Sequence, residues 1–537
     1  MFPQLDASDL ARLRRFGAVR SWGAGERVMT AGEVSSGMFV ILSGEVAVTQ
    51  HDAMGSREAI VTHGAGLFMA ELTALSGSPV LVDGIARTAI EAIVIPPPRL
   101  RDLMVQEADL GERIMRALIL RRVALIESEF SGPIIIGRAD NSDVLRLEGY
   151  LTRNGHPHRR LDPDTDESAK ALEQFHVKVE EVPIVLCPNG QMLRNPSETT
   201  LAGCLGLITP IDETKLYDVA IVGAGPAGLA AAVYAGSEGL SVLMLDCRAF
   251  GGQAGASARI ENYLGFPTGI TGMRLMARAF NQARKFGVEM SIPDEVVRLR
   301  SGSAGEFVLE TTRDQRARAR AVVIATGARY RRPDIGNLAE FEGSHVHYWA
   351  SPIEARLCAN EEVALVGAGN SAGQAAVYLA THARKVWLLM RGRSLGASMS
   401  HYLVDRISAQ DNIEVLAETE ISALEGENGR LDAVRWVHRP SGQETRRSVR
   451  HLFLFMGAEP NAEWLGSSGV EVDEKGFVRT NPELNRTFRP MQTSWPGVFA
   501  IGDVRACSVK RVASAVGEGA QVVAAIHAWL AEPRVTP

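Results

Sequence analysis

DVAIVGAGPAG, residues Asp218–Gly228, is the stretch of sequence that decides the fold of most of this chain. Its apolar run predicts a buried parallel strand, and a helix is expected to begin at Leu229. Gly223 permits the tight turn between them, Gly225 lets the backbone approach a pyrophosphate, and Gly228 lets the helix pack on the strand. Because a helix N-terminus attracts phosphate charge, the stretch predicts a Rossmann-like unit that binds a dinucleotide.

Three more strand ends favour this interpretation over a glycine-rich turn without a ligand. Asp246 ends the next strand, Ser241–Leu245, where a carboxylate can accept hydrogen bonds from ribose hydroxyls. Glycine closes two further apolar strands, at Ile324–Gly327 and Val498–Asp503. The second of these is expected to place Asp503 beside a ribityl chain.

A second strand, glycine turn and helix of the same type begins at Val363. Val363–Val366 leads into Gly367-Ala368-Gly369-Asn370-Ser371-Ala372-Gly373, which predicts a second dinucleotide site. The following strand, Lys385–Met390, ends at Arg391-Gly392-Arg393, and a guanidinium there can pair with a 2′-phosphate. We therefore expect NADPH rather than NADH, the alternative being a solvated basic turn. The expected contacts are Gly367, Gly369, Asn370, Ser371, Ala372, Arg391 and Arg393.

Residues 216–530 resemble the low-molecular-weight thioredoxin reductases, FAD-dependent pyridine nucleotide oxidoreductases. The resemblance extends to Gly251-Gly252-Gln253 and to the loop Ile260–Pro267, and it covers some 300 residues in the correct order. It implies rotation of the pyridine nucleotide domain about hinges near Arg329–Arg332 and Gly457–Pro460. The residues expected at FAD, from the motifs and the resemblance together, are Gly223, Gly225, Pro226, Ala227, Gly228, Asp246, Gly252, Gln253, Asn262, Thr326, Gly327, Gly502, Asp503, Lys510 and Arg511.

The redox disulfide of those reductases has no counterpart here. Its CxxC position falls at Tyr348–Pro352, and Trp349 and Pro352 occupy both cysteine positions. Hydride transfer from a nicotinamide to a flavin needs no protein nucleophile, so we assign no catalytic residue. Electrons are expected to pass from the flavin to an external small-molecule or protein acceptor, such as oxygen, a quinone or a redox protein. Trp349 is a candidate to cover the flavin face.

The five cysteines, Cys187, Cys204, Cys247, Cys358 and Cys507, are scattered, and the closest two are 17 positions apart. This spacing excludes a CxxC redox motif and a clustered metal site. We expect free thiols and, without an export signal, a cytoplasmic protein. Cys358 and Cys247 are candidates for a lone redox thiol, although a small buried hydrophobe is the commoner role of a free cysteine.

Residues 1–130 predict a β-roll followed by a helical stretch. Glycine-punctuated strands and the segment Gly66–Leu72 resemble the cyclic-nucleotide-binding β-roll, in which the acid at Glu71 would hold a ribose hydroxyl. The phosphate-binding arginine of that family would fall at about Leu81, and Asp83 follows it. An apolar residue and a carboxylate suit a phosphodiester poorly. The alternatives are glycine-turn amides that hold a phosphate and a degenerate roll kept for dimerisation or for contacts with the rest of the chain.

The helical stretch runs from Pro98 to about Phe130. Its apolar stripe is expected to need a partner surface, often a second subunit. The stripe residues are Leu103, Leu110, Ile114, Leu118 and Leu125.

Residues 133–207 resemble a thioredoxin-fold domain of glutaredoxin type. The expected order is strand Pro133–Gly137, helices around Ser142–Asn154 and Glu167–Phe175, strand Ile184–Cys187, and a helix after Pro196. Val182-Pro183 matches the cis-proline of that family, whereas Arg138–Ser142 contains no cysteine. The domain is therefore expected to be redox-silent and to act as an interface or spacer.

The chain is thus expected to be a multidomain protein: residues 1–130 a β-roll with its helix, 131–208 thioredoxin-like, 209–328 and 461–537 an FAD-binding domain, and 329–460 an NAD(P)H-binding domain, the last two being Rossmann-like α/β units. Its 537 residues carry a net charge of −6, which gives no reason to propose nucleic acid as a partner. No apolar stretch is long enough to span a membrane.

Three functions are compatible with the sequence. The first is an NADPH-dependent FAD oxidoreductase, for which regulation by a cyclic nucleotide through the β-roll and a homodimeric state are further expectations. The second is a non-catalytic flavin and nucleotide redox sensor or interaction protein. The third is a thioredoxin-disulfide reductase with displaced thiols.

Overall fold

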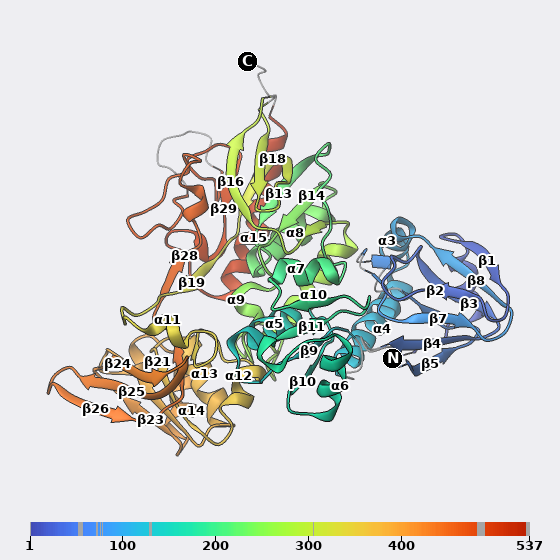
Figure 1. Ribbon diagram of the computed structural model, residues 1–537. Coiled ribbons are helices and arrows are strands. Elements are labelled where there is room, and N and C mark those ends of the chain that lie inside the picture. The colour runs from blue at the N-terminus through green and yellow to red at the C-terminus, as the bar shows by residue number, and fades with distance from the viewer. Residues whose placement is uncertain are drawn as a thin grey trace.

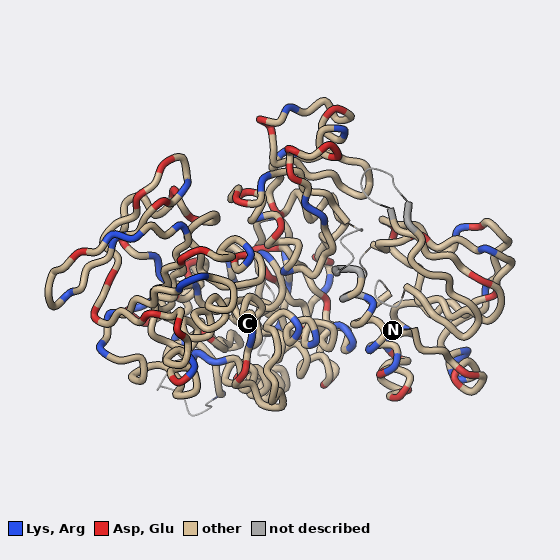
Figure 2. Tube along the Cα trace, turned by 90° about the horizontal axis from the view of Figure 1, so that it is seen from below, with Lys and Arg blue, Asp and Glu red and all other residues tan. Residues whose placement is uncertain are grey.

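The computed structural model describes residues 2–51, 57–70, 74–75, 77, 79–127, 132–303, 305–480 and 489–532. Figure 1 shows the β-roll on the right, the second nucleotide-binding unit at the lower left, the first in the upper middle, and an α/β unit in the lower middle between the roll and the second unit. Lysine and arginine are intermixed with aspartate and glutamate along the chain (Figure 2). No helix among the described residues is long and apolar enough to cross a membrane.

The β-roll consists of two four-stranded sheets, ordered β1-β8-β3-β6 and β2-β7-β4-β5. The two sheets enclose a core that contains Phe39, Ile41 and Val46. The elements are α1 Ala7–Leu13, β1 Ala18–Trp22, β2 Arg27–Met29, β3 Met38–Ser43, β4 Val46–His51, β5 Arg57–His63, β6 Phe68–Met69, β7 Asp83–Ala86, β8 Ile90–Ile95, α3 Pro97–Gln106 and α4 Ala108–Glu127.

The helical stretch after the roll is broken at Glu107 into α3 and α4. Its apolar stripe packs on the roll itself, in one core with Leu13, Phe16 and Met38. The expectation that a second subunit covers this stripe is wrong for Leu103, Leu110, Ile114 and Leu118, which are all buried within the chain. The physical reason is that the roll presents its own apolar face to α4. The side chain of Leu125 lies outside the described residues.

The unit in the middle, residues 132–207, is called the α/β module below. Its sheet has the order β10-β9-β11-β12, with β10 parallel and β11 antiparallel to β9, and β12 antiparallel to β11. The peptide bond Val182–Pro183 is cis, as the sequence predicted. The elements are β9 Ile134–Ile136, α5 Ser142–Arg153, β10 Arg159–Leu161, α6 Asp166–Gln174, η1 Val179–Glu181, β11 Ile184–Leu186, β12 Met192–Arg194 and α7 Glu198–Cys204.

The first nucleotide-binding unit, called the first half, is built on a seven-stranded sheet ordered β15-β14-β13-β18-β17-β16, with β29 beside β18. Helix α8 begins at Pro226, three residues before the predicted start, because Gly225 is its N-cap and Pro226 suits the first turn. The elements are β13 Leu216–Val222, α8 Pro226–Ser237, β14 Val242–Leu245, α9 Gly252–Gly255, α10 Gly272–Lys285, β15 Glu289–Ser291, β16 Val296–Ser301, β17 Phe307–Thr311, β18 Arg316–Ile324, η3 Glu463–Leu465, β29 Val498–Ala500, η4 Gly502–Val504 and α15 Val512–Leu530.

The second nucleotide-binding unit, called the second half, interrupts the first in chain order. It has a parallel sheet, β20-β27-β21-β22-β23, and a meander, β24-β25-β26, and the chain enters and leaves it through the antiparallel pair β19–β28. The elements are β19 Ala328–Tyr330, α11 Leu338–Phe341, β20 Val346–His347, α12 Pro352–Leu357, β21 Glu362–Val366, α13 Asn370–Ala380, β22 Lys385–Leu389, η2 Leu395–Ala397, α14 His401–Ser408, β23 Ile413–Leu416, β24 Thr419–Glu427, β25 Arg430–His438, β26 Gln443–Arg447, β27 His451–Leu454 and β28 Ala458–Pro460.

The packing of α4 on the roll can be tested with two leucines of the same helix. Leu118 is 1% exposed and Leu120 is 41% exposed. Leu118→Ala is expected to lower the local stability of α4 by about 2–5 kcal/mol, because it leaves a cavity. Leu120→Ala should change it by less than about 0.5 kcal/mol. Hydrogen exchange of α4 peptides in the full chain measures both, and equal effects would contradict this packing.

Candidate active site

The turn after β13 leaves no room for a side chain at two of its glycines. Gly223 has φ of +109°, and a Cβ there would lie 2.2 Å from the carbonyl oxygen of Ala325. A Cβ on Gly228 would lie 1.9 Å from the carbonyl oxygen of Gly223. Helix α8 therefore starts against the turn, and its free N–H groups face the space where a pyrophosphate would bind.

Asp246 lies beside this turn, as the sequence predicted, and it organises the backbone there. Its Oδ2 accepts a hydrogen bond from Ala224 N at 2.8 Å, and its Oδ1 accepts one from Arg248 N at 3.0 Å. Burial raises the pKa of this carboxyl, while the backbone N–H groups act in the opposite direction. The residue fits a ribose-binding acid at the end of β14.

Asp503 follows β29 and is oriented by its neighbours rather than paired with them. Gly502 N donates to Glu518 Oε2 at 2.6 Å, and Lys510 Nζ donates to the carbonyl oxygen of Asp503 at 2.7 Å. Burial raises the pKa of the Asp503 carboxyl. Within the described residues no protein donor bonds its carboxylate oxygens. A half-buried carboxylate in this state suits a ligand hydroxyl, so the site fits the ribityl chain of a flavin.

The remaining predicted FAD residues connect the first half to the entry strands. Gln253 Nε2 donates to the carbonyl oxygen of Ala328, and Thr326 Oγ1 donates to that of Asn461 at 2.7 Å. Asn262 is exposed, and Arg511 is the N-cap of α15. Gly225 and Gly252 approach each other, since a Cβ on Gly252 would lie 3.2 Å from Gly225 Cα. Pro226, Ala227 and Gly327 complete the turn regions.

The glycine turn of the second half repeats this geometry. Gly367 has φ of +154°, and a Cβ there would lie 2.8 Å from the Cβ of Ala372. Gly369 is the N-cap of α13, and Asn370 Oδ1 accepts a hydrogen bond from Ser400 N at 2.8 Å. The turn is close-packed at Gly367 but less tight than the first one, since Ala372 stands where the first turn has Gly228. It leaves the first N–H groups of α13 available to a phosphate.

The two arginines after β22 differ in their surroundings. Arg393 Nε bonds Glu418 Oε1 at 3.0 Å, and its side chain is 87% exposed. Arg391 is exposed and has no side-chain partner among the described residues. Arg391 is thus better placed than Arg393 to receive a phosphate. The sequence pattern did not distinguish between the two arginines.

The two halves meet at Tyr330, which sequence reasoning missed. Its ring packs edge-on against Phe455 of the second half, with centroids 5.2 Å apart. Burial raises the pKa of the Tyr330 hydroxyl, as does the charge of Asp503, while Ser371 of the second glycine turn acts in the opposite direction. Arg406 Nη1 and Glu261 Oε2 form an ion pair between the halves, at 2.5 Å. The two halves are therefore joined both at β19 and through this ion pair.

Trp349 does not lie free to cover a flavin. Its Nε1 donates to Glu354 Oε1 at 2.9 Å, and the guanidinium of Arg153, from the α/β module, lies over its ring at 4.3 Å. Pro352 is the first residue of α12. The structure thus places Trp349 at an interface with the module, where it makes a cation–π contact.

The thiol candidates are poorly suited to redox chemistry. Cys358 is fully buried, and burial raises the pKa of its thiol. Cys247 is exposed, but its thiol lies beside the carboxyl of Asp246, which also raises its pKa. A thiolate is the reactive form, so both groups are poor nucleophiles at neutral pH. Cys507 is the third free cysteine of the structure, and it is exposed.

The expectation that all five cysteines are free is wrong. Cys187 and Cys204 form a disulfide, with their Cα atoms 6.5 Å apart. The 17 positions between them concealed this, because the fold brings the end of β11 beside the end of α7. The α/β module therefore contains a disulfide.

Comparison with known proteins agrees with this geometry. Residues 217–519 match the family model described as pyridine nucleotide-disulphide oxidoreductase. The chain belongs to this family. It is thus an FAD-dependent oxidoreductase that uses a pyridine nucleotide, and its residues 19–107 match the cyclic nucleotide-binding domain.

Thioredoxin reductases are among the relatives of this oxidoreductase. That of Listeria innocua is 33% identical over 309 residues, which cover 57% of this chain and 92% of the relative. That of Bacillus subtilis is 31% identical over 328 residues, which cover 61% of this chain and 98% of the relative. The solved thioredoxin reductase of Lactococcus lactis superposes with a TM-score of 0.55 at 28% identity, covering 59% of this chain and all of the other. That of T. acidophilum gives 0.54 at 28% identity, over 58% and 98%.

The nucleotide site of the β-roll is only partly described. Glu71 lies outside the described residues. Asp83 is buried, and its Oδ1 accepts a hydrogen bond from Ala31 N at 2.8 Å, so this carboxylate supports the roll's backbone.

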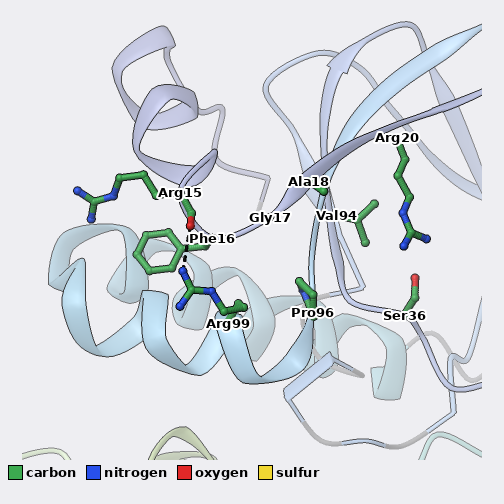
Figure 3. A pocket seen from close by; sticks show the side chains of 9 residues that line it. All are labelled: Arg15, Phe16, Gly17, Ala18, Arg20, Ser36, Val94, Pro96 and Arg99. Carbon is green, nitrogen blue, oxygen red and sulfur yellow. Dashed lines mark hydrogen bonds between the residues drawn. The ribbon is translucent and has the colours of Figure 1, made fainter.

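A separate pocket lies where α1, β1 and α3 meet (Figure 3). Two of its three arginines already have acidic partners: Arg15 pairs with Glu107 at 2.6 Å, and Arg99 with Asp102 at 2.8 Å. The lining residues are Arg15, Phe16, Gly17, Ala18, Arg20, Ser36, Val94, Pro96 and Arg99.

The close approach of α8 to its turn generates a prediction about FAD binding. Gly228→Ala forces the start of α8 away from the carbonyl oxygen of Gly223, at an overpacking cost of about 1–3 kcal/mol. We expect FAD affinity to fall roughly ten- to hundredfold, measured by fluorescence titration of the apoprotein. Gly517→Ala, in α15, is the control, since a Cβ there meets nothing within 4 Å. Unchanged FAD affinity in Gly228→Ala would contradict the proposed role of this turn.

Proposed function

We propose that this oxidoreductase oxidises NADPH, reduces its own FAD, and passes the electrons to an acceptor outside the chain without an internal CxxC relay. The observation that carries the proposal is the pair of glycine turns at the starts of α8 and α13, where Gly223 and Gly367 leave no room for a side chain. The first N–H groups of both helices are therefore available to the pyrophosphates of two dinucleotides.

The residues of this chain would act by binding and orientation. Bound FAD supplies the two-electron chemistry, which the protein does not need to provide. The turn Gly223–Gly228 and the start of α8 would hold its pyrophosphate, Asp246 the ribose, and Asp503 the ribityl hydroxyls. Gly367, Gly369 and the start of α13 would hold the pyrophosphate of the pyridine nucleotide. The remaining residues predicted from the sequence, including Asn262, Lys510 and Arg511, belong to the same proposal.

The preference for NADPH rests on Arg391. It follows β22, where dinucleotide-binding units meet the 2′ position of the ribose. Its side chain is exposed and has no partner within the described part of the chain, so it is available to a 2′-phosphate. No acid ends β22 to repel that phosphate.

The acceptor is proposed to be external, either a small molecule such as oxygen or a quinone, or a redox protein. Trp349 and Pro352 bring no sulfur to the position of the reductase disulfide, and Trp349 is engaged by Arg153 and Glu354. A thioredoxin reductase with displaced thiols is disfavoured because Cys358 is fully buried and its pKa is raised. A non-catalytic redox sensor remains the second candidate function.

The N-terminal parts are proposed to be regulatory. The β-roll would sense a nucleotide, and the α/β module would be a thioredoxin-like interface. The strand order β10-β9-β11-β12 and the cis bond before Pro183 support that fold. The module lies between the roll and the second half, below the first half (Figure 1). We further propose that the protein is a homodimer.

Anaerobic mixing with NADPH tests the proposed function. We expect rapid loss of the flavin absorbance band, followed by several turnovers when a quinone is added, because hydride transfer from the nicotinamide to the flavin needs no protein nucleophile. A flavin that stays oxidised would support the non-catalytic sensor instead. Thioredoxin-dependent turnover that is lost in Cys358→Ser would favour displaced thiols and contradict the external-acceptor mechanism.

Replacement of Arg391 tests the coenzyme preference. Arg391→Ala is expected to raise KM for NADPH roughly ten- to hundredfold and to leave KM for NADH unchanged, because one charge-assisted contact to the 2′-phosphate is lost. Arg384→Ala is the control, since Arg384 precedes the opposite end of β22. Equal changes with both coenzymes would show that Arg391 does not read the phosphate.

A calorimetric titration tests regulation through the β-roll. We expect cyclic AMP or cyclic GMP to release heat on binding and to change the rate of flavin reduction. Absence of both effects would remove the sensor from the proposal and leave the roll as a structural part.

A further inference from the structure

The disulfide of the α/β module fastens one end of a short helix. Cys187 directly follows β11, and Cys204 is the last residue of α7. Cys187 is fully buried, whereas Cys204 is part-exposed. Asn189 Oδ1 lies 4.0 Å from Cys204 Sγ. A reagent from solution therefore reaches the sulfur of Cys204 first.

The other end of α7 contacts the ribose-binding loop of the first half. Glu198, in the first turn of α7, forms an ion pair with Arg248 at 2.7 Å. Arg248 N donates to Asp246 Oδ1 at 3.0 Å, and the carbonyl oxygen of Arg248 accepts from Asn154 Nδ2 at 3.3 Å. Two contacts from the module thus converge on the residue that lies two positions after the ribose-binding acid.

Glu198 supplies negative charge to the interface between the α/β module and the first half. Arg153 and Arg248 are two guanidinium groups in the same region, and the carboxylates near Arg153 are Glu354, Glu198 and Asp246. Burial lowers the pKa of Arg153 to about 10, which reflects how little water reaches it. If Glu198 moves away, Arg153 and Arg248 lose one of the carboxylates that balance their positive charge near Asp246.

The disulfide end of α7 faces the β-roll. Gly206, two residues after Cys204, has φ of +64°, and a Cβ there would lie 2.6 Å from Pro79 Cγ of the roll. Helix α7 therefore reaches from the roll to the ribose-binding loop. It has seven residues, and so short a helix does not persist in water without anchors.

We propose that Cys187–Cys204 is a redox modification site that accepts external dithiols, and that its opening releases α7 from the ribose-binding end of the FAD site. A thiolate of the dithiol attacks Cys204 Sγ, the Cys187–Cys204 bond breaks, and Cys187 leaves as a thiolate that takes up a proton. The second thiolate of the reagent then attacks the reagent sulfur that is bonded to Cys204. This breaks the mixed disulfide, and Cys204 leaves as a thiolate that takes up a proton. The products are two cysteine thiols and one oxidised dithiol, so two electrons and two protons enter the protein.

The consequence is a weaker hold on FAD. Without the covalent tie, α7 is anchored by the packing of Leu201, Ala202 and Leu205 and by the Glu198–Arg248 pair. Movement of α7 removes that pair and exposes Arg248 and Asp246 to water. We expect FAD affinity to fall about tenfold on reduction. The proposal rests on the FAD site proposed above, but its readouts require no turnover.

Thiol counting tests the site itself. The protein is denatured without reductant and alkylated, and mass spectrometry should find three labelled cysteines, Cys247, Cys358 and Cys507. After treatment of the native protein with dithiothreitol, five should be labelled. Five labels before reduction, or three after it, would overturn the proposal.

Titration of the apoprotein with FAD, with and without dithiothreitol, tests the coupling. The affinity of the wild type should fall about tenfold with the dithiol, as should that of Cys358→Ala, the thiol control in the second half. Glu198→Gln should bind FAD as weakly as the reduced wild type and should no longer respond. A response in Glu198→Gln as large as in the wild type would overturn the path through α7. If Gly228→Ala does not alter FAD affinity while the thiol counts hold, the FAD site fails and the disulfide site stands.

Discussion

The arrangement of this molecule depends on the contact between the start of α8 and the turn after β13. A single carbonyl oxygen, that of Gly223, occupies the space that any side chain at position 228 would need. This contact holds the first N–H groups of α8 at the carboxyl edge of the sheet. The adjacent strands then bring Asp246 and Asp503 to the same edge, since β13 pairs with β14 and β18, and β18 with β29.

The second half is inserted through two adjacent strands rather than through a loose linker. The pair β19–β28 carries Tyr330, so the chain crosses between the halves at the point where Tyr330 packs against Phe455 of the second half. The α/β module adds a third set of contacts. Its Arg153 lies on Trp349 of the second half, and its Glu198 pairs with Arg248 of the first. The α/β module, for which the sequence predicted no redox chemistry, thus contacts both nucleotide-binding halves.

Local sequence signals predicted the two glycine turns with the strands and helices beside them, because the glycines at 223, 228 and 367 are required by backbone geometry. They also predicted β9, α5, α6, β11 and α7 of the α/β module and the cis bond before Pro183, but not the short strands β10 and β12. Contacts between distant segments were not predictable. No local pattern links Cys187 to Cys204, Tyr330 to Ser371, or Arg153 to Trp349, since each pair depends on how separate elements pack. The apolar stripe of α4 was recognised, but its partner was misassigned for the same reason.

The central claim is that FAD accepts two electrons from NADPH and that no disulfide of this chain accepts them from the flavin. An anaerobic titration that measures flavin absorbance against added NADPH tests it most directly. The account predicts that one equivalent of NADPH per FAD bleaches the flavin fully. A requirement for two equivalents would show that a disulfide accepts electrons from the flavin and would contradict the account.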